Sequence, residues 1–114
     1  EQVSRWYDEA LKDSGFVLPY RPEGFTSSWA QYTLQLPEYM DRKVLQDKLK
    51  AQGIPTMVYY PKPMHLQGAF AEMDSAKTSC PVTELLCRTV LSLPLHPYLT
   101  EKTVLTVTDQ ANKF

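Results

Sequence analysis

The residues best suited to chemistry gather in one stretch, Gly53–Phe70, which reads GIPTMVYYPKPMHLQGAF. Two adjacent tyrosines, Tyr59 and Tyr60, end an apolar run there, and a proline follows at once. Because proline has no amide hydrogen to give to a sheet, the chain must leave strand geometry just after Tyr60. The two tyrosine hydroxyls, Lys62 and His65 are therefore expected at a strand exit, where loops that contact ligands commonly lie on a rigid scaffold.

These side chains offer a ligand aromatic faces, hydroxyl groups and one cation. Tyrosine supplies a stacking face and a hydroxyl that donates or accepts, and Lys62 can pair with a phosphate or a carboxylate. Each residue also has a structural interpretation. Neighbours on a strand alternate, so either Tyr59 or Tyr60 is expected to point into the core. A single histidine such as His65 is often structural, and an exposed lysine is usually only solvated. No acidic residue lies at a spacing from His65 that would indicate a catalytic pair. This argues against an unrelated enzyme that uses Tyr60, His65 and a carboxylate.

Three further residues have two interpretations each. His96 lies between two prolines in LPLHPYL, where it either contacts a ligand or fixes a turn and packs the final helix. The pattern favours the turn. Arg21 and Arg42 each either clamp a phosphate or lie on the surface, and the sequence leaves both open.

Two motifs give the chain a family resemblance. The segment Gly53–Phe70 follows the pattern GI-x-T-x-x-(H/Y)YP, then P-x-H-x-Q and an aromatic residue, and Val90–Thr100 follows (V/L)LSLP-x-HP-x-L(T/S). Ser28 and Trp29 with Tyr32 add a matching entry strand. In these features almost the whole chain resembles the C-terminal small domain of the DegT/DnrJ/EryC1/StrS family. These are aminotransferases that use pyridoxal 5′-phosphate (PLP) and act on nucleotide-linked keto sugars.

The resemblance implies roles for individual residues. Tyr60 matches the family tyrosine that faces the sugar substrate or its diphosphate. Tyr59 stands where many members carry histidine, which weakens any role for it as a titrating group. The substrate-binding residues expected are Tyr60, His65 and Tyr59, which stand at motif positions of the family, and Lys62, whose charge suits a phosphate. The segment YYPKPMHLQ most resembles that of family members that act on UDP-linked acetamido sugars.

The resemblance also implies an activity for a longer parent protein, since the chain starts at Glu1 rather than Met. The parent would move an amino group from glutamate, through PLP, onto a keto group of a UDP- or dTDP-linked sugar. It would serve surface polysaccharide or other glycan biosynthesis and act as a homodimer.

PLP chemistry needs a lysine that forms a Schiff base, a carboxylate at the pyridine nitrogen and a phosphate cup. None of these is recognisable in this sequence. Residues 1–114 are therefore expected to be the small domain alone, without catalytic or cofactor-binding residues, and inactive by themselves. The alternative is a non-catalytic binding or regulatory domain from a member that lacks the lysine.

Composition agrees with one soluble domain. The 114 residues carry a formal net charge of −1, from 12 lysines and arginines against 13 acidic residues, so there is no basic footprint for nucleic acid. No apolar run approaches the roughly 20 residues of a membrane helix, and no signal-like start is present, which predicts a cytoplasmic protein.

Cys80 and Cys87 are predicted on one helix about 10 Å apart, too far for a disulfide. No finger-like spacing suggests zinc, so both are expected to be buried thiols.

Hydrophobic periodicity predicts the elements that position these residues. Four amphipathic helices are expected, at 3–11, 41–53, 81–90 and 100–111. Extended pieces are expected at 16–18, 30–36, 57–60 and 91–95, with a short helical turn at 64–70 and a surface loop at 71–79. Asp41, Pro81 and Thr100 are the helix start signals. The pattern predicts an α+β domain with a small sheet of about three strands covered by helices, and Trp29 as its main core anchor. The resemblance implies a mainly antiparallel sheet, as in the C-terminal domain of type I, aspartate aminotransferase-like PLP enzymes.

Overall fold

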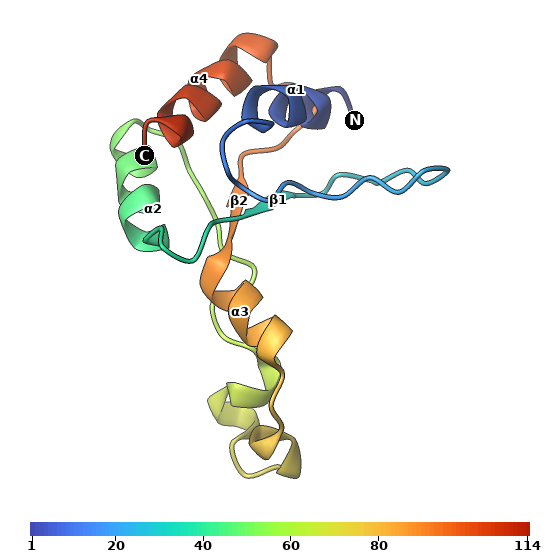
Figure 1. Ribbon diagram of the computed structural model, residues 1–114, viewed down its shortest axis with the longest axis vertical. Coiled ribbons are helices and arrows are strands. Elements are labelled where there is room, and N and C mark those ends of the chain that lie inside the picture. Colours follow the sequence, from blue (N-terminus) through green and yellow to red (C-terminus); the bar gives the residue numbers. More distant parts are fainter.

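The computed structural model describes residues 1–114 and has an α+β fold, with four α-helices, three short 3-10 turns and a two-stranded antiparallel sheet. The helices and strands are α1 (Gln2–Leu11), β1 (Tyr32–Gln35), α2 (Arg42–Ala51), α3 (Pro81–Thr89), β2 (Val90–Leu93) and α4 (Glu101–Asn112). The 3-10 turns η1 (Met64–Leu66), η2 (Gly68–Phe70) and η3 (Asp74–Lys77) lie between α2 and α3. In Figure 1 the sheet occupies the middle of the molecule, with α1 and α4 at one end and α3 with the 3-10 turns at the other.

The helices begin where the sequence supplies start signals. At α2 the Asp41 carboxylate accepts hydrogen bonds from two amides of the first turn, and at α4 the Thr100 hydroxyl accepts one. Such caps satisfy amides that have no partner inside the helix. Helix α3 opens with Pro81, whose missing amide costs nothing in the first turn. The four predicted helices are confirmed.

The sheet consists of β1 and β2, which run antiparallel. Its register pairs Tyr32 with Leu93, Thr33 with Ser92, Leu34 with Leu91 and Gln35 with Val90. Tyr32 and Leu34 are buried and alternate with half-buried neighbours, as a half-buried strand should. On the outer side of β1, Val17 adds one isolated bridge to Gln35. The predicted antiparallel pairing is confirmed.

The sheet has two strands where about three were predicted. The segment predicted as a strand at 57–60 contributes one isolated bridge, in which Met57 and Ser92 exchange both backbone hydrogen bonds. The chain then bends at Tyr59 and reaches Pro61. The pairing with Ser92 thus ends at Met57, and Pro61, which has no amide, could not resume it.

The hydrophobic core is built from the sheet and the helices α1, α2 and α4. Its centre is the pair Tyr7 and Tyr32, which are fully buried with ring centroids 4.8 Å apart. Trp29, predicted as the main core anchor, is only partly buried and stacks on Tyr32 at 6.1 Å. That prediction is wrong because the Trp29 indole nitrogen donates to the exposed carboxylate of Glu1, which keeps one edge of the ring at the surface. The other buried members are Val3, Leu11, Phe16, Leu34, Leu36, Leu45, Leu49, Ile54, Leu91, Leu93, Val104, Val107 and Ala111.

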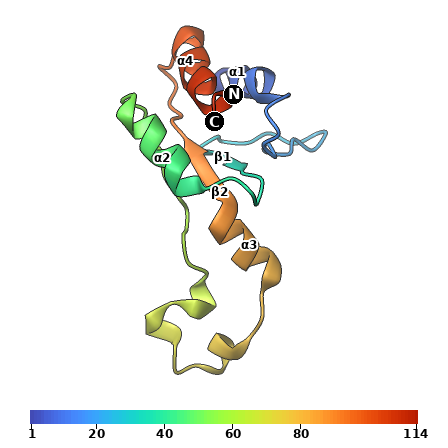
Figure 2. The same cartoon turned by 60° about the vertical axis from the view of Figure 1, so that its left-hand side comes forward.

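Two parts of the chain extend away from this core and give the molecule extents of 49 × 37 × 24 Å. Residues 18–31, which we call the excursion, leave the core before β1 and reach to the right in Figure 1. Residues 61–80, which we call the lobe, contain the three 3-10 turns and return to the start of α3, as Figure 2 shows. The predicted helical turn at 64–70 is confirmed as η1 and η2, and the predicted loop at 71–79 contains η3.

Both cysteines are free thiols next to or within α3. Cys87 lies in the helix and is buried, as predicted, whereas Cys80 lies directly before it and is only half-buried. None of the helices is long and apolar enough to pass through a lipid bilayer.

Candidate functional site

A cavity of about 310 Å³ lies between the strand exit predicted from the sequence and α3. One wall consists of Tyr59, Tyr60, Lys62, Pro63, Met64 and Gln67, and the other of Thr83, Leu86, Cys87 and Val90. We call it the tyrosine cavity. Its volume is at the lower end of the usual range for ligand pockets, about 300–1,000 Å³. Three of the four site residues predicted from the sequence, Tyr59, Tyr60 and Lys62, line it.

The two tyrosines are both open to solvent, with 38% of Tyr59 and 69% of Tyr60 exposed. Their rings meet edge to face, with centroids 5.8 Å apart and planes at 81°. The prediction that one of them points into the core is wrong. The chain is not a strand at these positions, so the alternation of strand side chains does not apply. Both phenols are therefore available to a ligand as stacking faces and hydrogen-bonding groups.

The polar groups of the tyrosine cavity suit an anionic ligand that also carries hydroxyl groups. Lys62 is its only charged lining residue, and Gln67 and Thr83 add an amide and a hydroxyl. The Gln67 amide donates to the Lys62 carbonyl over 3.4 Å. PLP needs a carboxylate at its pyridine nitrogen as well as a lysine, and no aspartate or glutamate lines this cavity. The cavity therefore does not fit PLP.

The fourth predicted site residue, His65, does not line the cavity. Its Nε2 lies 3.1 Å from Oε1 of Glu84 on α3, and its side chain is only 11% exposed. The same Glu84 oxygen accepts from the amide of Cys80 at 3.1 Å. The hydrogen bond from Cys80, and after it the one with His65, hold the pKa of Glu84 below its usual range.

Sequence reasoning missed Glu84 because it follows His65 by 19 positions. One local signal was available. Glu84 is an acidic residue in the first turn of a helix that opens with Pro81, where a carboxylate commonly reaches back to the amide before the helix. That signal predicts the contact with Cys80 but not the contact with His65.

Arg42 supports the α3 wall of the tyrosine cavity from the start of α2. Its Nη1 donates to the carbonyls of Cys87 at 2.7 Å and Val90 at 3.1 Å, and both of these residues line the cavity. The last carbonyls of a helix have no partner inside it, and Arg42 satisfies them where α3 passes into β2. Burial lowers the pKa of Arg42. Arg42 is thus a partly buried structural residue rather than a surface one.

His96 fixes a turn, as predicted. Its Nδ1 accepts from the amide of Tyr98 at 3.2 Å, and its carbonyl accepts from the amide of Leu99 at 3.2 Å. It does not line the tyrosine cavity.

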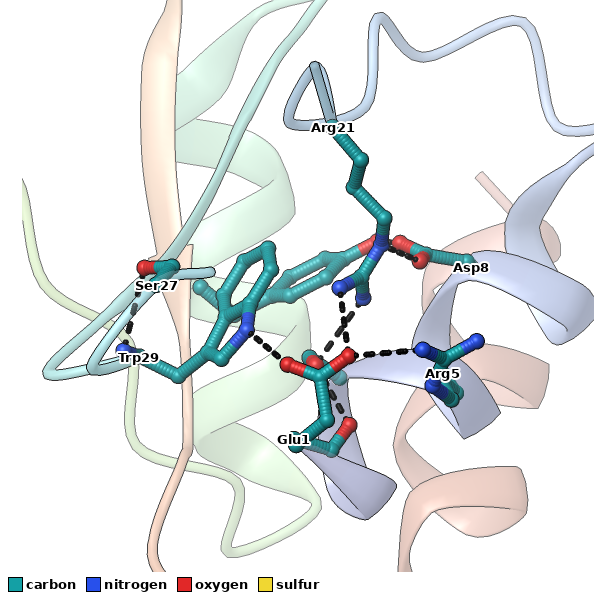
Figure 3. Close-up of polar contacts among 8 residues, drawn as sticks. Glu1, Arg5, Asp8, Arg21, Ser27 and Trp29 are labelled. Carbon is teal, nitrogen blue, oxygen red and sulfur yellow. Dashed lines mark hydrogen bonds and ion pairs between the residues drawn. The ribbon is translucent and has the colours of Figure 1, made fainter. Parts of the chain in front are cut away.

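A second polar cluster surrounds Arg21, as Figure 3 shows. The Arg21 Nε donates to Asp8 at 2.5 Å, its Nη2 donates to Ser4 at 2.9 Å, and its Nη1 lies 3.3 Å from Glu1. Its guanidinium carbon lies 4.2 Å from the centre of the Trp29 ring, within reach of a cation–π contact. A cleft of about 560 Å³ opens beside this cluster, and none of the predicted site residues lines it. Arg21 is engaged by its own chain and fastens the excursion to α1.

The Glu1 carboxylate completes the cluster around Arg21. It accepts from the Trp29 Nε1 at 2.7 Å and pairs with Arg5 at 3.0 Å. The hydrogen bond from Trp29, followed by the charges of Arg21 and Arg5, lowers the pKa of Glu1. The donors of this cluster are thus directed at carboxylates of the same chain.

Known proteins match most of the chain. The UDP-N-acetyl-3-dehydro-alpha-D-glucosamine 3-aminotransferase of Acidithiobacillus ferrooxidans is 39% identical over 103 residues, which cover 90% of this chain and 27% of that protein. A pleiotropic regulatory protein of Geobacillus stearothermophilus is 40% identical over 99 residues, which cover 87% of this chain and 26% of that protein. The crystal structure of a DegT DnrJ EryC1 StrS aminotransferase from Brucella abortus matches with a TM-score of 0.86 at 39% identity, covering 98% of this chain and 29% of that one.

The chain thus spans about a quarter of the length of the curated relatives it matches. The model of the DegT/DnrJ/EryC1/StrS aminotransferase family matches residues 1–112, which include both motifs, at Gly53–Phe70 and Val90–Thr100. The resemblance inferred from those motifs is confirmed. This chain belongs to the DegT/DnrJ/EryC1/StrS aminotransferase family.

Proposed function

We propose that the protein containing this chain is a PLP-dependent aminotransferase that moves an amino group from glutamate to a keto group of a nucleotide-linked sugar. Within it, residues 1–114 form the C-terminal small domain and supply one side of the substrate site. The observation that carries the proposal is the tyrosine cavity, which the motif at Gly53–Phe70 lines with two exposed phenols and one cation. The name of the relative from A. ferrooxidans supports a UDP-linked sugar as substrate. The product serves surface polysaccharide or other glycan biosynthesis.

In this proposal the tyrosine cavity receives the nucleotide-linked sugar, which presents a diphosphate, ring hydroxyls and a base. Tyr60, the more exposed of the two tyrosines, packs its ring against the sugar or diphosphate and offers its hydroxyl. Tyr59 supports that ring through the edge-to-face contact. Lys62 pairs with phosphate charge.

The cofactor lies outside this chain in the proposal. The lysine that holds PLP, the carboxylate at its pyridine nitrogen and the phosphate cup belong to a large domain upstream, so residues 1–114 are inactive by themselves. The absence of any acidic residue from the lining of the tyrosine cavity supports this division. We also propose that the parent protein is a cytoplasmic homodimer.

Replacing Tyr60 tests the substrate role. In the protein that contains this chain, Tyr60→Phe should raise KM for the keto sugar about 3- to 10-fold, the effect of one lost neutral hydrogen bond. The absorption of bound cofactor should not change. Steady-state kinetics with glutamate and a panel of UDP- and dTDP-linked keto sugars supply the measurement.

The matched control is Tyr39→Phe, because Tyr39 is exposed and lies outside the cavity. It should leave KM unchanged. If KM and kcat are both unchanged in Tyr60→Phe, Tyr60 does not belong to the substrate site. If no keto sugar of the panel is turned over by the wild-type protein, the proposed activity itself fails.

The second candidate is a non-catalytic regulatory protein that keeps the fold but lacks the cofactor lysine. The name of the relative from G. stearothermophilus, a pleiotropic regulatory protein, supports this candidate. Incubation of the intact protein with PLP, followed by dialysis against buffer without PLP, separates the two. Stoichiometric retention of the cofactor with turnover supports the enzyme, whereas binding of a sugar nucleotide without retained cofactor or turnover supports the regulator.

A further inference from the structure

We propose that His65 is a positioning residue, which through Glu84 clamps the lobe onto α3 and so sets the width of the tyrosine cavity. The inference deepens the proposed function and rests on it for the identity of the ligand, a nucleotide-linked sugar. It assigns His65 a role different from the direct substrate contact expected from the sequence. The contact between His65 Nε2 and Glu84 Oε1, at 3.1 Å, carries the argument.

The clamp joins the two walls of the cavity. His65 lies on η1 between Met64 and Gln67, which line the cavity from the side of the lobe. Glu84 lies on α3 directly after Thr83, which lines it from the opposite side. The distance between the walls therefore depends on whether His65 and Glu84 stay together.

No other hydrogen bond connects the lobe residues 61–71 to α3. Within the lobe, the backbone bonds of η1 and η2 are local, such as those from Leu66 to Pro63 and from Gln67 to Met64. Pro63, directly before η1, is the one buried residue of the lobe, and no residue of η1, η2 or η3 is buried, so apolar packing holds these turns only at their start. A segment with few buried contacts opens easily, and a single partly buried hydrogen bond then has a large influence on its position.

The α3 wall is the fixed partner in this arrangement. Arg42 holds the carbonyls of Cys87 and Val90 at one end of α3, and the Glu84 carboxylate accepts from the amide of Cys80 at the other. Glu84 is thus already held on α3 when it meets His65. The clamp positions the lobe, and with it Lys62, against a rigid helix.

Substitution at His65 tests the proposal in the full protein that contains this chain. His65→Ala and Glu84→Ala should each raise KM for the keto sugar about tenfold, the effect of a lost hydrogen bond to a charged group, and leave kcat within about twofold. The double variant should be no worse than Glu84→Ala alone, because the contact of His65 with Glu84 is already lost in that single variant. His65→Gln should recover most of the wild-type KM, since its amide nitrogen reaches the place of Nε2, whereas the shorter His65→Asn should not.

Peptide-resolved hydrogen exchange provides a readout that does not depend on activity. In His65→Ala the amides of Leu66 and Gln67 should exchange faster, while those of α4 keep their wild-type rates. The matched control is Asp74→Asn, which removes the exposed ion pair of Asp74 with Lys77 in the same lobe. It should alter neither exchange nor KM.

The outcomes separate the possible failures. Unchanged exchange in His65→Ala overturns the clamp, whatever the kinetics. Additive effects of His65→Ala and Glu84→Ala on KM also overturn it, since they would mean that His65 touches the substrate directly. If the wild-type protein turns over no keto sugar, the proposed function fails, and the exchange measurement still decides whether His65 and Glu84 hold the lobe.

Discussion

The side chain of Arg21 joins the excursion to α1. From the excursion its guanidinium donates to Asp8 and Ser4 on α1 and covers the ring of Trp29, which precedes β1. Asp8 accepts in turn from the hydroxyl of Tyr32 at 2.8 Å. A planar guanidinium can serve these partners at once, whereas the ammonium of a lysine cannot. Of the two interpretations open from the sequence, a phosphate clamp or a surface residue, neither describes this structural role.

Replacing Arg21 should therefore destabilise the protein even when the charge is kept. Arg21→Lys should lower the free energy of unfolding by about 2 kcal/mol, through the lost hydrogen bonds and the lost contact with Trp29. Denaturant unfolding gives the measurement. Arg5→Lys is the control, because the Arg5 side chain is 65% exposed. This variant should have the same free energy of unfolding as the wild type. Equal stability of both variants would show that the Arg21 cluster contributes nothing.

At the scale of elements, the helices were predictable because their signals are local. Asp41 and Thr100 cap helices that begin one residue later, and hydrophobic periodicity identifies the buried faces of these helices. The strand predicted at 57–60 failed because a strand needs a partner along its whole length. Only Met57 has one, and an alternating sequence pattern does not report where the partner chain turns away.

The candidate site, too, was predictable only where its residues are close together in the sequence. Tyr59, Tyr60 and Lys62 are nearly consecutive, so a short motif was enough to bring them to one cavity wall. The opposite wall comes from α3, and its supports are set by tertiary packing. The contacts of Glu84 with His65 and of Arg42 with the end of α3 join residues 19 or more positions apart, and no local pattern in a single sequence predicts them.

The cap of α2 gives a prediction that belongs to this scale. Asp41→Ala should lower the free energy of unfolding by about 1 kcal/mol, because two amides of the first turn lose their acceptor. Asp41→Asn should retain most of the stability, since asparagine also caps well. Denaturant unfolding of both variants checks this, and a loss in Asp41→Asn equal to that in Asp41→Ala would contradict the capping role.

The whole molecule combines one packed core with a weakly anchored lobe. The core holds α1, α2, α4 and the sheet around Tyr7 and Tyr32, whereas the turns η1, η2 and η3 bury no residue. The two tyrosines also connect the core through their hydroxyls, since Tyr7 donates to the carbonyl of Pro94 at 2.7 Å and Tyr32 donates to Asp8. We expect the core to unfold as one unit and the lobe to open before it.

This central pair makes stability depend on alkaline pH. Burial raises the pKa of Tyr7 and of Tyr32 well above the usual value, and the hydrogen bond to Asp8 raises that of Tyr32 further. In the unfolded chain both titrate near their ordinary value of about 10. Below that pH both states keep the protons and the contribution of the pair is fully present. Above it the unfolded state loses protons that the folded state retains, so stability falls as pH rises.

The melting temperature should therefore stay level up to about pH 9.5 and fall steeply above about pH 10. Tyr7→Phe should be less stable at neutral pH, because the bond to the Pro94 carbonyl is lost, yet its melting temperature should fall less steeply in alkali. Tyr98→Phe is the control, since Tyr98 is 88% exposed and its hydroxyl is not part of the buried core. Thermal unfolding across this pH range gives the slopes. A slope in Tyr7→Phe as steep as in the wild type would mean that Tyr7 ionises without unfolding the core.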